Sequence, residues 1–538
     1  MLNNEVYLKT SAEVCSQVAS YFDIVDNCIA TSDTNKQYSV SPQTSYSPSP
    51  PIKAGSYTSV IISPNSHNTA DIYNGFIRVN MQCTYNQSSA LAITTTNLAE
   101  ETYRFDKVWF GFKDARDAVE KYEIVANGIT IYTQNFGCEE SFLTACCSNE
   151  VSKRADVYSK ARHKDVFKNN FATRCGTVVN LATSQSGVFT IRLKIDLRRF
   201  LPLSNIKYLP AFAGKIELRL YFSCAGMVYC PVGIDEDILA NPAVNGIITR
   251  TAITNEFTQI NEPITMWNTI TYTRDTKSPP NLTGITLSSG TVTFNISDYE
   301  VTECASIIPC FGIDNAIYNQ LISRYSNPSH PLTFPTQSLS FFTTTKPLDS
   351  RQDKTTITVT PRFVDSIFCL FPLKHTHHTY FKNPQFTHFQ LNAGGYGNIP
   401  VKSFGTTGED PEFIEYCQNA MNVNGDQNGF NKEVIASLCN RSKFNENTTG
   451  FRSDDKSSFF IGFATETDGT YQQGLTSLSP INFEMICTQS DSADSFAKHT
   501  KTPPLLCLLF DISISILVMA NGQPPHVRIG AYDLTTPE

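Results

Sequence analysis

Two segments in the first half of the chain alternate strictly between apolar and charged or polar side chains. In residues 191–198 the apolar positions are Ile191, Leu193, Ile195 and Leu197, and residues 215–222 repeat the pattern. Successive side chains of a β-strand point to opposite faces, so each segment predicts a strand with one face toward a core and one toward water. Such strands are typical of a layer in an antiparallel β-sandwich.

Length and composition extend this prediction to the whole chain. The chain has 538 residues, more than one hydrophobic core usually serves, and this favours two domains. It contains 36 Phe, 23 Tyr, 28 Pro and 27 Gly, and only 17% of its residues are charged. Aromatic residues favour strands while Pro and Gly interrupt them, so the predicted fold class is all-β with short helices in loops.

The clearest turn is Asn127-Gly128, which lies between two β-rich runs and predicts a tight type I′ hairpin. A second series of strands follows, without the alternating helices of a parallel α/β sheet. These predicted strands cover residues 246–253, 264–272, 284–296, 338–345, 355–360, 365–371, 386–392, 457–464 and 505–519. Short helices are expected at 13–22, 113–120 and 411–420.

These patterns predict a domain organisation with one linker. We expect an N-terminal arm or linker at 1–54, because residues 31–51 are rich in Ser, Pro, Thr and Gln. A first sandwich at 55–235 and a linker at 236–260 should follow, the linker beginning in an acidic, Pro-containing stretch. The second sandwich should occupy 261–538, with a long loop insertion at about 394–474 that is rich in Gly, Asn and Ser.

Charge and cysteine usage restrict the possible partners. The net charge of −8 argues against a body that binds nucleic acid along much of its surface. The basic stretch at 153–168 is better interpreted as a solvated loop or a face for a partner subunit. The 16 cysteines are scattered through apolar runs, which is typical of reduced, buried thiols in an intracellular protein. The apolar segment 505–520 is too short to span a bilayer, so no transmembrane anchor is expected.

Local signatures of catalysis are absent from the sequence. Gly214-Lys215 lacks the preceding glycine of a phosphate-binding loop, and no Gly-x-Ser-x-Gly, His-Glu-x-x-His or Cys-x-x-Cys occurs. The turn-like Gly394-Gly395-Tyr396-Gly397 lacks the helix and the third spaced glycine of a nucleotide loop. We therefore predict a protein that is not an enzyme, with no catalytic residue and no cofactor.

Two groups of side chains are weak candidates for metal binding. His375 and His377 would share one face of a strand next to His378, but no nearby carboxylate or cysteine completes a metal shell. The acidic triplet at 235–237 suits calcium, although such triplets in linkers are usually only solvated. The matching spacing of Cys224 and Cys230 with Cys304 and Cys310 indicates nothing beyond chance. No metal site is predicted.

Three blocks of sequence together resemble one known family. The blocks are Ile61-Ile-Ser-Pro-Asn65 leading into residues 71–79; residues 108–122 with the Ala126-Asn-Gly128 turn; and residues 191–222, centred on 199–210. This combination resembles the major capsid protein of Maverick/Polinton-type elements and related large DNA viruses, the double jelly-roll family. The second half is similar through residues 380–391, and the 394–474 insertion has no counterpart.

The resemblance implies a structural role. It implies two jelly rolls in tandem in one chain, which trimerises into a pseudo-hexameric capsomer of an icosahedral viral shell. The implied partners are further copies of the chain together with penton and minor capsid proteins, without sequence-specific binding to nucleic acid. The implied location is the virion capsid, after synthesis in the cytoplasm or nucleus of the host cell.

Two alternatives stay open. One is a jelly-roll scaffold that templates a particle without remaining in it. The other is a carbohydrate-binding β-sandwich, which would use exposed aromatic platforms or, if it cleaved its ligand, a pair of carboxylates. Trp109 and Trp267 both lie in strand-like apolar runs, which weakens this second alternative.

Overall fold

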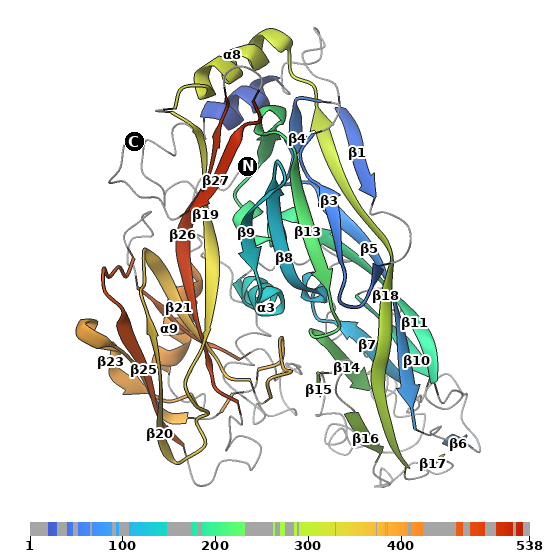
Figure 1. Ribbon diagram of the computed structural model, residues 1–538. Helices are drawn as coiled ribbons and strands as arrows, with labels where there is room; N and C mark the ends of the chain where they lie inside the picture. The colour runs from blue at the N-terminus through green and yellow to red at the C-terminus, as the bar shows by residue number, and fades with distance from the viewer. Residues whose placement is uncertain are drawn as a thin grey trace, which may run out of the picture.

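A computed structural model gives the structure of the protein. It describes residues 20–28, 40–46, 52–64, 67–88, 93–95, 107–147, 175–180, 186–231, 262–263, 270–274, 285–287, 290–328, 330–372, 374–381, 383–384, 386–406, 411–422, 459–465, 474–489, 502–519 and 523–530. The described part is built mainly of antiparallel strands, which form two sandwiches side by side (Figure 1).

The first sandwich consists of two facing sheets. One sheet has the order β1–β18–β5–β11, and the other has the order β3–β13–β8–β9, continued by β14, β7 and β10. In chain order the strands are β1 (Val40–Tyr46), β3 (Tyr57–Ile61), β5 (Phe76–Gln87), β7 (Lys107–Phe112), β8 (Val119–Ala126), β9 (Ile129–Gln134), β10 (Gly176–Asn180), β11 (Ser186–Asp196), β13 (Ile216–Phe222), β14 (Met227–Pro231) and β18 (Gly290–Phe311).

These strands occupy eight positions in the two sheets, because three of the positions each hold two strands: β7 and β8, β9 and β10, and β13 and β14. When the positions are lettered B to I in chain order, one sheet has the order BIDG and the other the order CHEF. This is the strand order of a jelly roll. Short pieces add to these sheets: β2 (Ile52–Lys53), β4 (Thr69–Asp71), β12 (Tyr208–Pro210), β15 (Glu262–Pro263) and β16 (Ile270–Arg274). β6 (Ile93–Thr95) and β17 (Ile285–Leu287) pair with each other in a separate two-stranded sheet.

The alternating segments lie where their pattern predicts. Along β13 every second residue from Ile216 to Phe222 is buried, and the intervening residues are partly exposed. In β11 the side chains of Ile191, Leu193 and Ile195 are buried in the core of the first sandwich. The prediction of one wet and one dry face is therefore confirmed for both strands.

The hairpin prediction is also confirmed. Asn127 and Gly128 join β8 to β9 with φ values of 51° and 86°, the left-handed conformations that a type I′ turn requires. The Asn127 side chain accepts a hydrogen bond from the backbone N–H of Lys215 at 2.9 Å and donates one to the carbonyl of Pro525 at 2.9 Å. The turn thus also contacts the C-terminal segment of the second sandwich.

The second sandwich repeats the same strand order. Its sheets are β19–β26–β21–β24 and β20–β25–β22–β23, again BIDG and CHEF, and β27 pairs with the end of β26. The strands are β19 (Leu332–Thr343), β20 (Gln352–Val359), β21 (Val364–Leu370), β22 (Phe386–Ala393), β23 (Asn398–Phe404), β24 (Ile461–Ala464), β25 (Ile481–Gln489), β26 (Leu505–Leu517) and β27 (His526–Gly530). The fold is therefore all-β with two jelly rolls in tandem, as predicted.

The two jelly rolls point in the same direction. β18 ends the first roll, helix α8 (Asn315–Tyr325) crosses one end of the molecule, and β19 begins the second roll there (Figure 1). Because β26 is antiparallel to β19, the last strands of both rolls run toward the end that carries α8. A helix at residues 20–28 covers the same end, where Tyr21 contacts the rings of Tyr325 and Phe334 edge-on.

The predicted boundary between the domains was wrong. β18 lies at 290–311, inside the predicted second sandwich, but it pairs with β5 and β1 of the first. The predicted linker at 236–260 lies outside the described residues, while the connection seen in the structure is the α8 segment after Phe311. β1 lies inside the predicted arm of 1–54. Both errors arise because strand pairing depends on contacts between residues far apart in the sequence.

The predicted insertion at 394–474 was too broad. It contains β23 and β24, which are strands of the second jelly roll. The predicted helix at 411–420 is present as α9 (Pro411–Asn422), in the connection between these two strands. Turn-rich composition concealed β23, whereas β24 lies within the predicted strand at 457–464. The predicted strand at 246–253 lies outside the described residues.

Membership of β18 in the first sandwich can be tested in the full chain. Val301 of β18 is 1% exposed in the first core, whereas Thr302 is exposed. Val301→Asp should cost about 3–5 kcal/mol, the usual effect of an uncompensated buried charge. Hydrogen exchange should speed up in β5 more than in β22, and Thr302→Asp should leave both unchanged. Faster exchange in β22 alone would assign the strand to the second sandwich.

Candidate functional site at the junction of the two sandwiches

Helix α3 (Gly137–Cys147) links the two sandwiches. It follows β9 of the first sandwich, yet Phe142, Leu143 and Cys146 belong to the core of the second. The rings of Phe142 and Phe381 lie 4.7 Å apart. The helix can start so close to the sheet because residue 137 is a glycine: a Cβ there would lie 2.4 Å from the carbonyl oxygen of Val119.

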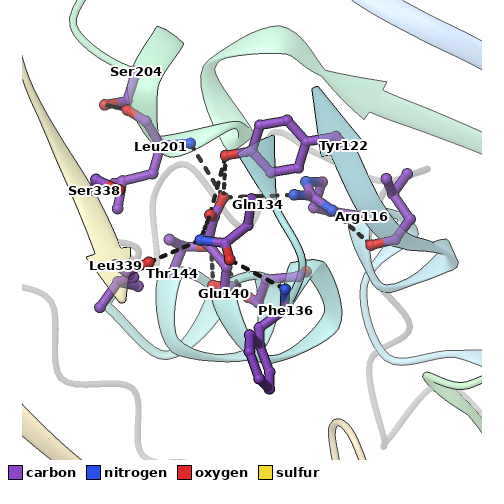
Figure 2. A network of polar contacts seen from close by, with 12 residues as sticks. Arg116, Tyr122, Gln134, Phe136, Glu140, Thr144, Leu201, Ser204, Ser338 and Leu339 are labelled. Carbon is purple, nitrogen blue, oxygen red and sulfur yellow. Dashed lines mark hydrogen bonds and ion pairs between the residues drawn. The ribbon is translucent and has the colours of Figure 1, made fainter. Parts of the chain in front are cut away.

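Glu140 of α3 is the centre of a buried polar network (Figure 2). Its carboxylate lies 3.5 Å from the Arg116 guanidinium, and neither side chain has exposed surface. Tyr122 donates its hydroxyl hydrogen to the carboxylate, with oxygen distances of 2.9 and 3.0 Å. The backbone N–H of Leu201 also points at it, at 3.4 Å. The buried carboxylate is therefore held by a cation and by neutral donors, as such groups require.

Arg116 is fixed independently of this ion pair. Its guanidinium carbon lies 4.7 Å from the ring centre of Tyr122 and 4.3 Å from that of Phe200. One of its nitrogens donates to the carbonyl of Val119 at 3.0 Å. Stacking between two aromatic rings suits the flat, weakly hydrated arginine group.

Gln134 carries the network across to the second sandwich. Its amide nitrogen donates to Glu140 at 2.9 Å and to the carbonyl of Leu339, in β19, at 2.8 Å. Beside it, the hydroxyls of Tyr132 and Ser338 lie 2.7 Å apart, and the Thr336 hydroxyl donates to the carbonyl of Leu201 at 3.0 Å. These bonds fix the position of β19 against the first sandwich.

The electrostatics of the network reflect its burial. Loss of water raises the pKa of Glu140 above its ordinary value, and Arg116 with the donors from Gln134, Tyr122 and Leu201 lowers it part of the way back. Burial also raises the pKa of Tyr122. With neither Arg116 nor Glu140 exposed, no ligand reaches the pair. The arrangement is suited to holding two sandwiches in one orientation and not to chemistry on a bound molecule.

The three candidate metal ligands His375, His377 and His378 do not lie in a strand. They lie in the connection between β21 and β22, where His375 is exposed and the His377 ring packs edge-on against Tyr380. His378 reaches the carboxylate of Glu139 in the first sandwich, at 2.7 Å. Among the described residues, no group of three or more His, Cys, Asp or Glu side chains could hold a metal ion.

The other residues that the sequence offered as candidate site residues are either buried or part of a tight turn, or they lie outside the described residues. Gly394-Gly395-Tyr396-Gly397 forms the tight turn between β22 and β23, closed by a 2.8 Å bond from the N–H of Ala393 to the carbonyl of Gly397. Cys224, Cys304 and Cys310 are buried. The basic stretch at 153–168, the acidic triplet at 235–237, Trp267 and the side chains of Trp109 and Cys230 are outside the described residues.

The sequence alone did not predict the buried contact between the two sandwiches. Glu139 and Glu140 begin an otherwise apolar helix, and Arg116 lies in a short turn between two strands, so each resembles an ordinary surface charge. The one signal was the Phe-Leu run that follows Glu140, which indicates that this helix is buried. None of the helices in the described part of the chain is long and apolar enough to cross a membrane.

The buried pair makes a quantitative prediction. Glu140→Ala leaves the positive charge of the Arg116 guanidinium buried without its carboxylate, and the free energy of unfolding should fall by about 3–5 kcal/mol. The matched control is Glu484→Ala, which removes the 2.8 Å pair with Lys354, a side chain that is 68% exposed. The control should cost less than about 1 kcal/mol. Equal costs in denaturant titrations would show that the junction is not held by Glu140.

No protein-family model matches the sequence, and no curated protein matches it. The structure is similar to several solved structures. The mavirus major capsid protein is 11% identical with a TM-score of 0.46, and the similarity covers 92% of each chain. A chain of the Sputnik virophage is 11% identical with a TM-score of 0.44, over 92% of this chain and 89% of the other. The Faustovirus major capsid protein is 7% identical with a TM-score of 0.42, over 90% and 91%.

Two of these three neighbours, those of mavirus and Faustovirus, are major capsid proteins. The fold of this chain follows from its own strand order, BIDG and CHEF in each of two sandwiches. The chain is a double jelly-roll protein.

Proposed function

We propose that the chain is a major capsid protein, a structural building block whose copies associate as trimers into a pseudo-hexameric unit of an icosahedral shell. The observation that carries the proposal is the pair of complete jelly rolls that point in the same direction in one chain. A threefold axis beside such a chain generates six similar rolls around a ring. A trimer then fits a position surrounded by six neighbours.

The buried junction supports this role. A shell unit must keep its two rolls at one angle, because an error there would be repeated in every copy of the closed assembly. Gln134, which bonds both Glu140 of α3 and the carbonyl of Leu339 in β19, and the apolar face of α3 provide such a fixed angle. Hydrogen bonding and apolar packing therefore both oppose rotation of one roll against the other.

The described surface does not favour the carbohydrate-binding alternative. Tyr57 is 51% exposed and lies 5.4 Å from Tyr221, which resembles an aromatic platform. However, Arg219 lies over the Tyr57 ring and Lys121 over the Tyr221 ring, at 5.5 and 4.6 Å. These cations occupy a face on which a sugar would stack, so the pair is better suited to holding neighbouring strands together.

In the proposed role the protein is part of the virion capsid and contacts its own copies first. Penton and minor capsid proteins would fill the positions that a sixfold-like unit cannot occupy. The role needs no catalytic residue, cofactor or metal ion. A scaffold protein would share the fold but would be absent from finished particles.

The mass of the purified chain in solution tests the proposal. Light scattering should give three times the 59.8 kDa of one chain, and negative-stain images should show roughly hexagonal outlines with threefold symmetry. Obligate interfaces usually bury more than about 2,000 Å², so the trimer should persist on dilution to nanomolar concentration. A stable monomer would contradict the proposal, and absence of the protein from purified particles would favour the scaffold.

A further inference from the structure

The contact between His378 and Glu139 joins the two sandwiches through a titratable pair. His378 lies in the loop between β21 and β22, and Glu139 lies in the first turn of α3. The Nδ1 atom of His378 lies 2.7 Å from a carboxylate oxygen of Glu139. The histidine side chain is 26% exposed and the glutamate 6%, so the pair is largely removed from water but open to protons.

The loop that carries His378 is anchored to the first sandwich at the next residue, Thr379. The Lys113 ammonium donates to the carbonyl of Thr379 at 3.0 Å, and the Thr379 hydroxyl donates to the carbonyl of Gly226 at 3.1 Å. Lys113 also lies 5.7 Å from the ring centre of Tyr380. These bonds hold the backbone next to His378 against the first sandwich, within reach of α3.

Two carboxylates, those of Glu139 and Glu120, act on the charge of His378. Burial disfavours the imidazolium, but the hydrogen bond and charge of Glu139, with the charge of Glu120, outweigh it and raise the pKa of His378 above its ordinary 6.5. Lys113 is the cation that faces the pair from the loop before the first sandwich's 3-10 turn. The histidine's own loop adds Lys374 and His375, both exposed, and His377.

A second proton site lies under the same helix. Asp117 is 2% exposed, and its carboxylate accepts a hydrogen bond from the N–H of Asp114 at 3.1 Å. The Cys138 thiol of α3 donates to the Asp117 carbonyl at 3.2 Å, which links the turn to the helix. Burial and the charge of Asp114 raise the pKa of Asp117 to about 7, against the opposing effects of the Ser141 hydroxyl, the Asp114 N–H and Lys113.

We propose that the junction is a proton-sensitive clamp: mild acidification adds a proton at His378, which fastens the second sandwich more tightly to α3, and a proton at Asp117, which stabilises the turn that supports α3. The proposal is independent of the function proposed above, because it concerns one chain and not its assembly.

Both groups act in the same direction. His378 binds its proton more tightly in the folded chain than in the unfolded chain. Its contribution to the free energy of unfolding is therefore complete below about pH 6.5, and it is lost as the pH rises through the raised pKa of the folded chain. Asp117 is uncharged in the folded chain below about pH 7, whereas the unfolded aspartate stays ionised down to about 3.8. The folded chain therefore takes up more protons than the unfolded chain between about pH 8 and 6, and acidification in that window stabilises it.

Thermal unfolding of the full chain at pH 8 and pH 6, at constant ionic strength and protein concentration, tests the clamp. The wild-type midpoint should rise by at least about 2 °C on acidification, and hydrogen exchange in α3 should slow. His378→Gln should remove part of this rise by lowering the midpoint at pH 6. Asp117→Asn, which imitates the protonated acid, should remove another part by raising the midpoint at pH 8.

The matched control is His375→Gln, in the same loop but exposed, and it should keep the full wild-type rise. The double variant His378→Gln/Asp117→Asn should show little change between the two pH values. The proposal is refuted if acidification raises the unfolding midpoint of the double variant as much as that of the wild type. A residue that acts only by packing would shift the midpoint equally at both pH values, which also contradicts the proposal.

Discussion

The packing of α3 into the core of the second sandwich is the constraint on which the rest of the molecule depends. The helix belongs by sequence to the first jelly roll, yet its apolar side chains complete the second core. Burial of these side chains excludes water from the junction. It thereby creates the environment in which Glu140 needs Arg116, Tyr122 and Gln134 as partners. Apolar packing makes the two rolls adhere, and the polar network selects one orientation among those that packing alone would allow.

The same reasoning explains why the junction contains ionisable groups at all. Removal of charges from water is costly, and an apolar replacement of a buried ion pair is often as stable. The ion pair instead fixes Glu140 as a partner for Gln134. Gln134 must reach both Glu140 and the carbonyl of Leu339, and this is possible only in one register of β19 against β9. In the proposed role, where the chain repeats in a closed assembly, a single angle between the rolls would matter more than additional stability.

Local features of the fold could be predicted from sequence, and features that depend on distant pairing could not. The alternation in β11 and β13, the Asn127-Gly128 turn and the helix at 411–420 are determined by residues close together in the chain, and each prediction is confirmed. β1 lies in a Ser- and Pro-rich tract, and only its partner β18 makes it a strand. The junction escaped prediction for the same reason, since Glu139 meets His378 from 239 positions away.

The pairing of β1 with β18 has a consequence for biosynthesis. Val40 pairs with Phe311, so the first jelly roll cannot close until more than half of the polypeptide has left the ribosome. Until then β5 lacks its central neighbour, and its unpaired edge is open to other nascent chains on the same messenger. Folding of such non-local sheets is slow. The early segments therefore remain without their partner strand until β18 is translated.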